Sequence, residues 1–308
     1  MILLYIKDYE FLTKIVQYLG DAKVSYTTDM NDNFDYVLVA DMSKSTFNFI
    51  KNNPLKKIIF LTEIEETRMY QNMISNTKKS KLYCSNMYKF LNKCYKVITS
   101  SMYIKKELID KYKNVFYIPS VLPTISFSGN NKDIYEKYSI KKRKKVIAIF
   151  DFLYKHVDVL FYLSEKYPKY HFVYIGYNTY YNLSFRYKNF LKMIGSNVTF
   201  VKYVDETIFS DVCKVSNYVI YYESFIKSKN YIYIPLLLKR SLLVEDILWY
   251  QDFLVNSKNA YLFKNNDSLY LKFSKILENR VMNLTENGYE LVISNNYPSI
   301  IKKYSEYL

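Results

Sequence analysis

SNYVIYYESFIKSKNYIYIPLLLKRSLLVEDILWYQDFL, residues 216–254, is the stretch that decides the fold of this chain. It contains an apolar run (218–222), a carboxylate directly after it (Glu223), an apolar helical segment (231–238) and a second apolar run (241–245). Continuous apolar runs separated by a helix are typical of parallel strands that are buried on both faces. Ligands of open parallel sheets bind outside the carboxyl ends of the strands. We therefore predict that Glu223 lies at a ligand site, with capping of the following segment as its alternative role.

The same alternation of strand and helix runs through the whole chain. The expected strands are 1–6, 35–40, 57–61, 96–99, 115–118, 146–150, 170–175 and 198–202, besides the two in the opening stretch. The expected helices are 9–19, 44–52, one or two within 69–95, 105–112, 134–138, 157–166, 183–193 and 206–214. Strands that alternate with helices predict right-handed crossovers and parallel sheets. Breaking residues gather between Pro119 and Asn131, and this change of character predicts a boundary between two α/β domains.

Composition and charge limit the classes of function. The net charge of +15 favours an anionic partner, which would be the phosphates of a nucleotide, a nucleic acid or anionic lipid headgroups. The alternative is a solvated, lysine-rich surface. The five glycines are too far apart to build a glycine-rich phosphate loop. The Lys-, Asn-, Ile- and Tyr-heavy composition is typical of an AT-rich genome, such as that of a virus or a parasite.

The cysteines and the apolar segments bear on the compartment. Three widely spaced cysteines and two histidines do not make a zinc site, and an odd number of cysteines fits a reducing, intracellular compartment. The apolar start is broken by Lys7 and Asp8, and no run of about 18 uncharged apolar residues follows. We expect a cytoplasmic protein that is soluble or peripheral to a membrane.

Two charged clusters lie outside the opening stretch. The first cluster follows the predicted strand 57–61 and consists of Glu63, Glu65 and Glu66. These carboxylates either complement the positive N-terminal end of a helix dipole, or Glu63 or Glu65 faces a cleft between the domains. The basic run 141–145 (KKRKK) either binds phosphate or serves as a solvated linker.

The order of the segments resembles a known family. The segments KKVIAIFDFLYKHVDVLFYL, FVYIG, NVTFVKYVDETIFSDVCKVSNYVIYYESF, LLVED and NAYLF are similar to the C-terminal domain of the retaining glycosyltransferase family 4, which has the GT-B fold. In the first half, KVITSSMYIKKELIDKYKNVFYIPS is similar to the segment ahead of that family's linker. The resemblance covers nearly all of the chain and is strongest from Lys145 to Phe263.

This resemblance implies an architecture of two Rossmann-like parallel-sheet domains that face each other across a cleft. The acceptor domain would be 1–128, the linker 129–144 and the nucleotide-sugar donor domain 145–296. A C-terminal helix, 297–308, would cross back to the first domain. Closure of the domains would exclude water from the reacting groups.

The resemblance also implies roles for individual residues. Glu223 matches the first glutamate of the family's E-x7-E motif, which contacts the transferred sugar. Lys155 matches the lysine of its K-G-x-D segment, which holds the donor phosphates. Gly176 ends the strand before the nucleotide-base region, to which we also assign Tyr203. Glu63 lies where the family places an acceptor-side catalytic group.

The chain departs from the family pattern at several positions. Phe150 occupies the place of an arginine that binds phosphate, and we expect Lys227 and Lys229 to replace its charge. Tyr231 stands eight residues beyond Glu223, where the motif has its second glutamate, and Ile226 stands where the family prefers glycine. The motif is therefore degenerate.

The sequence thus predicts a hexosyltransferase that moves a sugar from a UDP- or GDP-linked donor to a hydroxyl of a glycan, protein or lipid. We expect a retaining reaction without a metal or another cofactor, because lysines and helix N-termini can stabilise the leaving diphosphate. Contact with an anionic membrane is a further expectation. The alternatives are an inactive GT-B scaffold and a basic nucleic-acid-binding protein. Specific nucleic-acid binding is disfavoured because most tyrosines fall inside apolar runs and no RNA or DNA motif is present.

Overall fold

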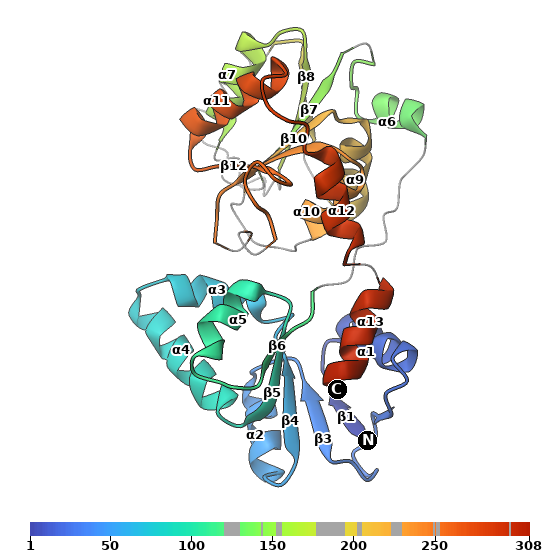
Figure 1. The fold of residues 1–308 in the computed structure, drawn as a ribbon, viewed down its shortest axis with the longest axis vertical. Helices are drawn as coiled ribbons and strands as arrows, with labels where there is room; N and C mark the ends of the chain where they lie inside the picture. The colour runs from blue at the N-terminus through green and yellow to red at the C-terminus, as the bar shows by residue number, and fades with distance from the viewer. Residues whose placement is uncertain are drawn as a thin grey trace. The chain divides into compact units, whose positions relative to one another are not determined.

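Two parallel β-sheets, each of six strands in the described part of the chain, form the centres of two separate units (Figure 1). The computed structural model describes residues 1–119, 130–142, 144–151, 156–176, 195–201, 205–222, 230–248, 250, 253–295 and 297–308. Unit 1 comprises Met1–Val121 and Asn295–Leu308, and unit 2 comprises Leu122–Ser294. The predicted α/β class with two parallel sheets is confirmed.

Unit 1 has the strand order β2-β1-β3-β4-β5-β6. Its strands are β1 (Ile2–Tyr5), β2 (Tyr26–Thr27), β3 (Tyr36–Val39), β4 (Lys57–Leu61), β5 (Cys94–Thr99) and β6 (Val115–Tyr117). Its helices are α1 (Tyr9–Asp21), α2 (Lys44–Asn52), α3 (Glu66–Ile74), α4 (Lys78–Leu91), α5 (Met102–Ile109) and α13 (Tyr297–Tyr307). The central strands are apolar without alternation because helices cover both faces of the sheet. Leu38 and Ile59, for example, are fully buried in one core cluster.

The C-terminal helix α13 packs against α1 within unit 1 (Figure 1). The ring of Tyr18 on α1 contacts the rings of Tyr297 and Tyr304 on α13, with centroid separations of 5.7 and 5.4 Å. Ile300 is fully buried between them and the sheet. The last turn is held by Lys96 of β5, whose Nζ donates to the carbonyl oxygen of Tyr307 at 2.6 Å. Aromatic packing and one backbone contact thus fasten the chain end to the first sheet.

Unit 2 has the strand order β12-β11-β10-β7-β8-β9. Its strands are β7 (Val146–Asp151), β8 (His171–Ile175), β9 (Val198–Val201), β10 (Tyr218–Tyr222), β11 (Ser241–Glu245) and β12 (Tyr261–Phe263). Its helices are α6 (Asn131–Lys137), α7 (Val157–Lys166), α9 (Glu206–Val215), α10 (Asn230–Leu237), α11 (Asn266–Leu277) and α12 (Thr285–Ile293). This order is that of a Rossmann sheet, whose topological switch point lies between β7 and β10. There Asp151 and Tyr222 are register partners at the last position of each strand.

Side-chain caps determine where several helices begin. The capping residues are Asp8, Ser43, Thr77, Ser101, Asn130, Asp205 and Asn265, each of which accepts a backbone N–H of the first turn. Such a cap satisfies an N–H group that has no partner inside the helix. Ser101 explains one error of the sequence prediction. Helix α5 begins at Met102, not at 105, because the Ser101 hydroxyl accepts from the N–H of Ile104 at 3.3 Å.

Tyrosine is a core residue in this protein. Tyr174, Tyr221, Tyr222, Tyr233 and Tyr250 all belong to the largest fully buried side chains of unit 2. These rings fill volume that leucine or phenylalanine fills in most cores, and they are not displayed as stacking platforms. Among the described residues, no helix is both long and apolar enough to cross a membrane.

His171, the first residue of β8, makes the stability of unit 2 dependent on pH. Its Nε2 lies 3.0 Å from the hydroxyl of Thr199, and its Nδ1 has no hydrogen-bond partner among the described residues. Burial lowers the pKa of His171 to about 4, and the charges of Lys141 and Lys144 act in the same direction. Between the ordinary histidine pKa of about 6.5 and pH 4, the unfolded chain therefore binds a proton that the folded chain does not.

We expect the free energy of unfolding to decrease as the pH falls through this window, by at most about 3 kcal/mol from His171. Urea unfolding at pH 7.5, 6.0 and 5.0 measures the slope. The variant His171→Asn, which cannot take up the proton, is expected to lose that part of the pH dependence. An identical slope in the variant and the wild type would show that another group is responsible.

Candidate functional site

A pocket of about 360 Å³ opens at the carboxyl edge of the unit 2 sheet. It adjoins the ends of β10, β11 and β12, the residue that precedes α7 and the first residues of α11. Its lining residues are His156, Tyr222, Glu245, Phe263, Lys264, Asn265, Asn266 and Asp267. The pocket therefore lies where an open parallel sheet binds its ligands, next to the switch point between β7 and β10.

One wall of the pocket is a network centred on a stacked pair of rings. The ring of His156 lies 3.9 Å from that of Tyr222 with an interplanar angle of 12°. The backbone N–H of His156 donates to Asp151 Oδ2 at 2.6 Å, and the Tyr174 hydroxyl donates to the same oxygen at 2.7 Å. The Tyr222 hydroxyl donates to Asn266 Oδ1 at 3.0 Å. These bonds join β7, β8 and β10 to the starts of α7 and α11 and hold the wall in one arrangement.

The electrostatics of the pocket combine anion-binding and hydroxyl-binding groups. Burial raises the pKa of Tyr222, and the nearby Tyr270 and Asp151 add to this effect, so the hydroxyl stays protonated as a donor. The first turns of α7 and α11 place the positive ends of two helices at the pocket, together with Lys264. Glu245 and Asp267 supply carboxylate oxygens, which accept from hydroxyl groups. Such a site suits a ligand that carries both phosphate and hydroxyl groups.

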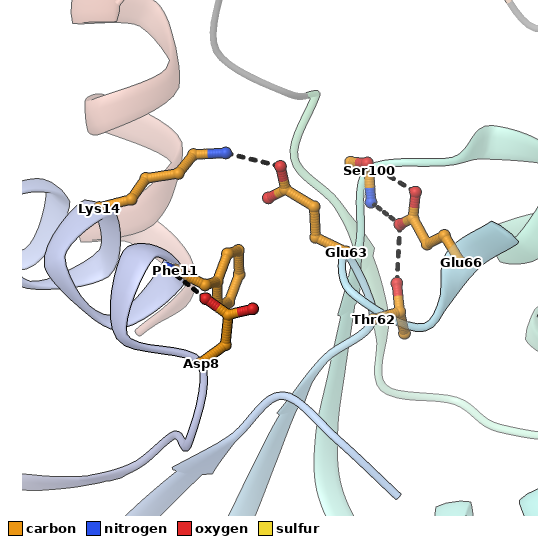
Figure 2. A network of polar contacts seen from close by, with 7 residues as sticks. All are labelled: Asp8, Phe11, Lys14, Thr62, Glu63, Glu66 and Ser100. Carbon is orange, nitrogen blue, oxygen red and sulfur yellow. Dashed lines mark hydrogen bonds and ion pairs between the residues drawn. The ribbon is translucent and has the colours of Figure 1, made fainter. Parts of the chain in front are cut away.

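The carboxylate cluster of unit 1 separates into a buried and an accessible part. Glu66, the first residue of α3, is only 3% exposed. Its carboxylate accepts from the hydroxyls of Thr62 (2.7 Å), Thr99 (2.8 Å) and Ser100 (2.7 Å), and from the N–H of Ser100 (2.5 Å). Figure 2 shows this carboxylate between the ends of β4 and β5. Glu66 thus joins two strand ends. It lies in the first turn of α3, as the helix-dipole interpretation of the acidic cluster predicted.

Glu63 points the other way, toward α1 (Figure 2). Its carboxylate pairs with the Nζ of Lys14 at 2.6 Å, and the two side chains are 26% and 31% exposed. Burial raises the pKa of Tyr18, and Glu63 adds to the shift. Of the two glutamates, Glu63 is the one that an incoming molecule can reach.

The other residues singled out from the sequence have the following places. Gly176 directly follows β8, is buried, and donates its N–H to the carbonyl oxygen of Val201 at 3.4 Å. The predicted site residues Glu223, Lys155, Lys227, Lys229 and Tyr203 lie outside the described residues. Within the described ranges, no group of three or more His, Cys, Asp and Glu side chains is arranged to hold a metal ion.

Sequence reasoning missed the contribution of β12 and α11 to this edge. Lys264, Asn266 and Asp267 line the pocket, and Asn265 caps α11 with a reciprocal bond to Ser268. The signal was present as an apolar run (261–263) followed by the sequence Lys-Asn-Asn-Asp. Asparagine shortly after an apolar run is a typical helix start. The strand must therefore end before it.

Comparison with known proteins identifies the fold. No family model and no curated protein sequence matches the chain. The structure is similar to sucrose-phosphate synthase from Thermosynechococcus elongatus, with 12% identity, a TM-score of 0.64 and coverage of 96% of this chain and 76% of that one. It is similar to a glycosyltransferase from Rickettsia africae (14% identity, TM-score 0.62, coverage 99% and 96%). It is also similar to Anabaena HepE in complex with UDP and glucose (10% identity, TM-score 0.63, coverage 96% and 80%). The chain has the GT-B fold of these glycosyltransferases.

Glu63 and Glu66 are expected to differ in their effect on stability. Glu66→Ala should lower the free energy of unfolding by about 3 kcal/mol or more, because it leaves several buried donors without an acceptor. Glu63→Ala should cost about 1 kcal/mol or less, because a partly exposed ion pair contributes little. Denaturant unfolding of both variants measures the difference. Equal losses would show that Glu66 does not hold the ends of β4 and β5 together.

Proposed function

We propose that this protein is a glycosyltransferase that binds a nucleotide-sugar donor at the carboxyl edge of unit 2. The observation that carries the proposal is the 360 Å³ pocket, where two helix N-termini and a lysine meet carboxylate and amide side chains at a Rossmann switch point. The fold supports it, because the similar solved structures are glycosyltransferases and one of them contains UDP and glucose. We therefore infer a UDP-linked donor, with a GDP-linked one as the alternative.

Within this proposal the cationic and the anionic groups of the pocket bind different parts of the donor. Lys264 and the first turns of α7 and α11 face the diphosphate, since both favour negative charge. The carboxylates of Glu245 and Asp267 accept from hydroxyls of the ribose or the sugar. A carboxylate near the nucleotide hydroxyls would serve the purpose of the glutamate that the E-x7-E motif lacks in this chain.

Two of the site residues predicted from the sequence are chain neighbours of residues that line the pocket. Glu223 comes directly after Tyr222, the last residue of β10, and Lys155 comes directly before His156 at the start of α7. Both neighbours line the pocket. We assign Glu223 to the transferred sugar and Lys155 to the diphosphate, with Lys227 and Lys229 as further cations for the phosphates. Gly176 and Tyr203 belong to the nucleotide side.

The reaction we propose is retaining and independent of metal ions. The bond between the anomeric carbon and the diphosphate oxygen breaks, and the acceptor oxygen bonds to the same face of that carbon. The acceptor proton passes to the diphosphate, so charges and atoms balance. Catalysis then consists of stabilising the negative charge that develops on the leaving group, which lysines and helix N-termini can do.

The acceptor side is assigned to unit 1. Glu63 is partly exposed and follows β4 at the carboxyl edge of its sheet, and its pairing with Lys14 orients it. A carboxylate in this place can hydrogen-bond an acceptor hydroxyl of a glycan, a protein or a lipid. Glu63→Gln is expected to raise the KM for the acceptor without changing the affinity for the nucleotide.

Nucleotide binding can be tested without knowing the sugar. Saturating UDP should raise the melting temperature, because a ligand at about 100 times its Kd stabilises the folded state by about 2.7 kcal/mol. Lys264→Ala should weaken UDP binding about tenfold, since it removes a charge-assisted contact. Lys258→Ala, an exposed lysine outside the pocket, is the matched control. Unchanged binding in Lys264→Ala would place the nucleotide elsewhere.

Turnover tests the catalytic assignment. Transfer and hydrolysis assays over a panel of UDP-, GDP- and ADP-sugars should show activity that persists in EDTA. Glu223→Gln should lower turnover about a hundredfold or more while UDP affinity stays the same, because the carboxylate acts on the reacting sugar. Glu165→Gln, on the exposed face of α7, controls for loss of charge. UDP binding without turnover on any donor would favour the inactive scaffold.

A further inference from the structure

Helix α4 in unit 1 carries exposed lysines and no carboxylate of its own. Residues 67–106 contain nine Lys and Arg residues and no Asp or Glu. Four of these lysines lie on α4, and all four are exposed: Lys78, Lys79, Lys81 and Lys89. Among the described residues, their side chains have no hydrogen bond or ion pair.

Lys78 and Lys89 lie on one stripe of the helix, and Lys81 and Lys79 flank it, turned from Lys78 by about 60° and about 100° in opposite directions. Residues 78, 82, 85 and 89 follow the i, i+4, i+7, i+11 spacing of a helical stripe, and all four are exposed. The opposite side is formed by Ser80, Met87, Phe90 and Leu91, which are buried against the sheet. Helix α4 therefore has one face that packs in the core and one that is cationic.

Two exposed apolar side chains accompany these lysines, one on α4 and one at the end of α3. Leu82 is 64% exposed at the centre of the stripe, and Ile74, the last residue of α3, is 51% exposed just ahead of α4. Only Ser75, Asn76 and Thr77 separate the two helices. Figure 1 shows α3 and α4 next to each other at the side of unit 1. The surface made by Ile74, Leu82 and the four lysines is called the α4 face below.

The lysines are placed at a cost to the helix. Three of the first four residues of α4 are lysines, although the N-terminus of a helix favours negative charge. The first turn contains no acidic residue to offset them. Such an arrangement lowers the stability of the isolated chain and becomes favourable when an anionic surface lies opposite.

We propose that the α4 face docks onto an anionic lipid bilayer. Lysines on one side of a surface helix are attracted by acidic headgroups, and the neighbouring Leu82 and Ile74 can enter the boundary between headgroups and acyl chains. This docking would bring unit 1 to a membrane. The inference does not rest on the proposed glycosyl transfer.

The aromatic residues of α4 favour a bilayer over a nucleic acid. A nucleic-acid platform needs free aromatic faces for the bases to stack on. The ring of Tyr83 is covered by the guanidinium of Arg68 at 4.8 Å, and the ring of Tyr88 by the Nζ of Lys111 at 4.1 Å. Both rings are thus occupied by cations of unit 1, and the exposed residues of α4 between the lysines are Leu82, Ser85 and Asn86.

Co-flotation with lipid vesicles tests the proposal. The full chain is mixed with vesicles of phosphatidylcholine alone, or of phosphatidylcholine and phosphatidylglycerol in equal parts, at low and high salt. We expect binding to the anionic vesicles only, weaker at high salt because the charges are screened. Each lysine near the surface contributes roughly a fivefold factor to the partition coefficient. Replacing Lys78, Lys79, Lys81 and Lys89 by Gln should therefore weaken binding by about a hundredfold or more.

Two matched variants separate the charge of the α4 face from the charge of the whole chain. The control replaces four exposed lysines of other helices and loops by Gln, namely Lys132, Lys258, Lys275 and Lys302, and should keep binding within a few-fold of the wild type. Leu82→Ser keeps every charge and should weaken binding several-fold, with the larger effect at high salt. Melting curves should show that the quadruple α4 variant is at least as stable as the wild type, because it removes cations from a helix N-terminus.

Two outcomes would overturn the proposal. Equal vesicle binding by the α4 variant and the wild type would show that another surface binds the lipid, or that no specific surface does. Binding of a single-stranded oligonucleotide that is lost in the α4 variant, without vesicle binding by the wild type, would assign the α4 face to nucleic acid.

Discussion

Burial of parallel strands on both faces is the constraint on which the rest of this structure depends. A strand such as β10 is covered on both faces, so polar side chains can be reached by solvent or a ligand only at its ends. Since every strand of a parallel sheet runs in the same direction, all carboxyl ends meet at one edge. At the unit 2 edge, Asp151 and Tyr222 are partners in register, and the bonds they make reach the starts of two helices. The pocket is a consequence of this convergence.

The same edge position leads to different roles for carboxylates, and the number of nearby donors decides which role results. Glu66 is surrounded by hydroxyl and N–H donors at the carboxyl ends of β4 and β5, so its charge is compensated and it serves the structure. Glu63, three residues earlier, has one cation from α1 and remains partly exposed. A carboxylate whose acceptor sites are filled by the protein has nothing left for a ligand, whereas a partly exposed one does. This difference is why we propose Glu63, and not Glu66, for the acceptor side.

Charge and aromatic residues are distributed in a related way. Tyrosines such as Tyr174 fill the core, and their hydroxyls are used to bind internal carboxylates such as Asp151. Lysines lie at the surface, and on α4 no acidic residue of the same helix offsets their charge. In α11, by contrast, Asp267 stands in the first turn and Lys275 in the last, as the helix dipole favours. The lysines in the first turn of α4 are therefore a local feature, and not a property of all helices in this basic chain.

The sequence by itself determined the two parallel sheets and most of their strands, because a continuous apolar run between helical segments has few other stable arrangements. Prediction from the sequence failed where the local signal is short, as for β2 with its two residues, and where a capping side chain sets the helix start, as for α5. The helices α11 and α12 were not predicted either. Only the tertiary structure decided that Glu65 and Glu66 are buried after β4 and that Glu63 stays partly exposed. Only it brought His156, Tyr222, Glu245 and Lys264 to one pocket, since more than a hundred residues separate the first from the last. The physical reason is that strand register and helix packing, which depend on contacts between distant segments, set the direction and the neighbours of each side chain.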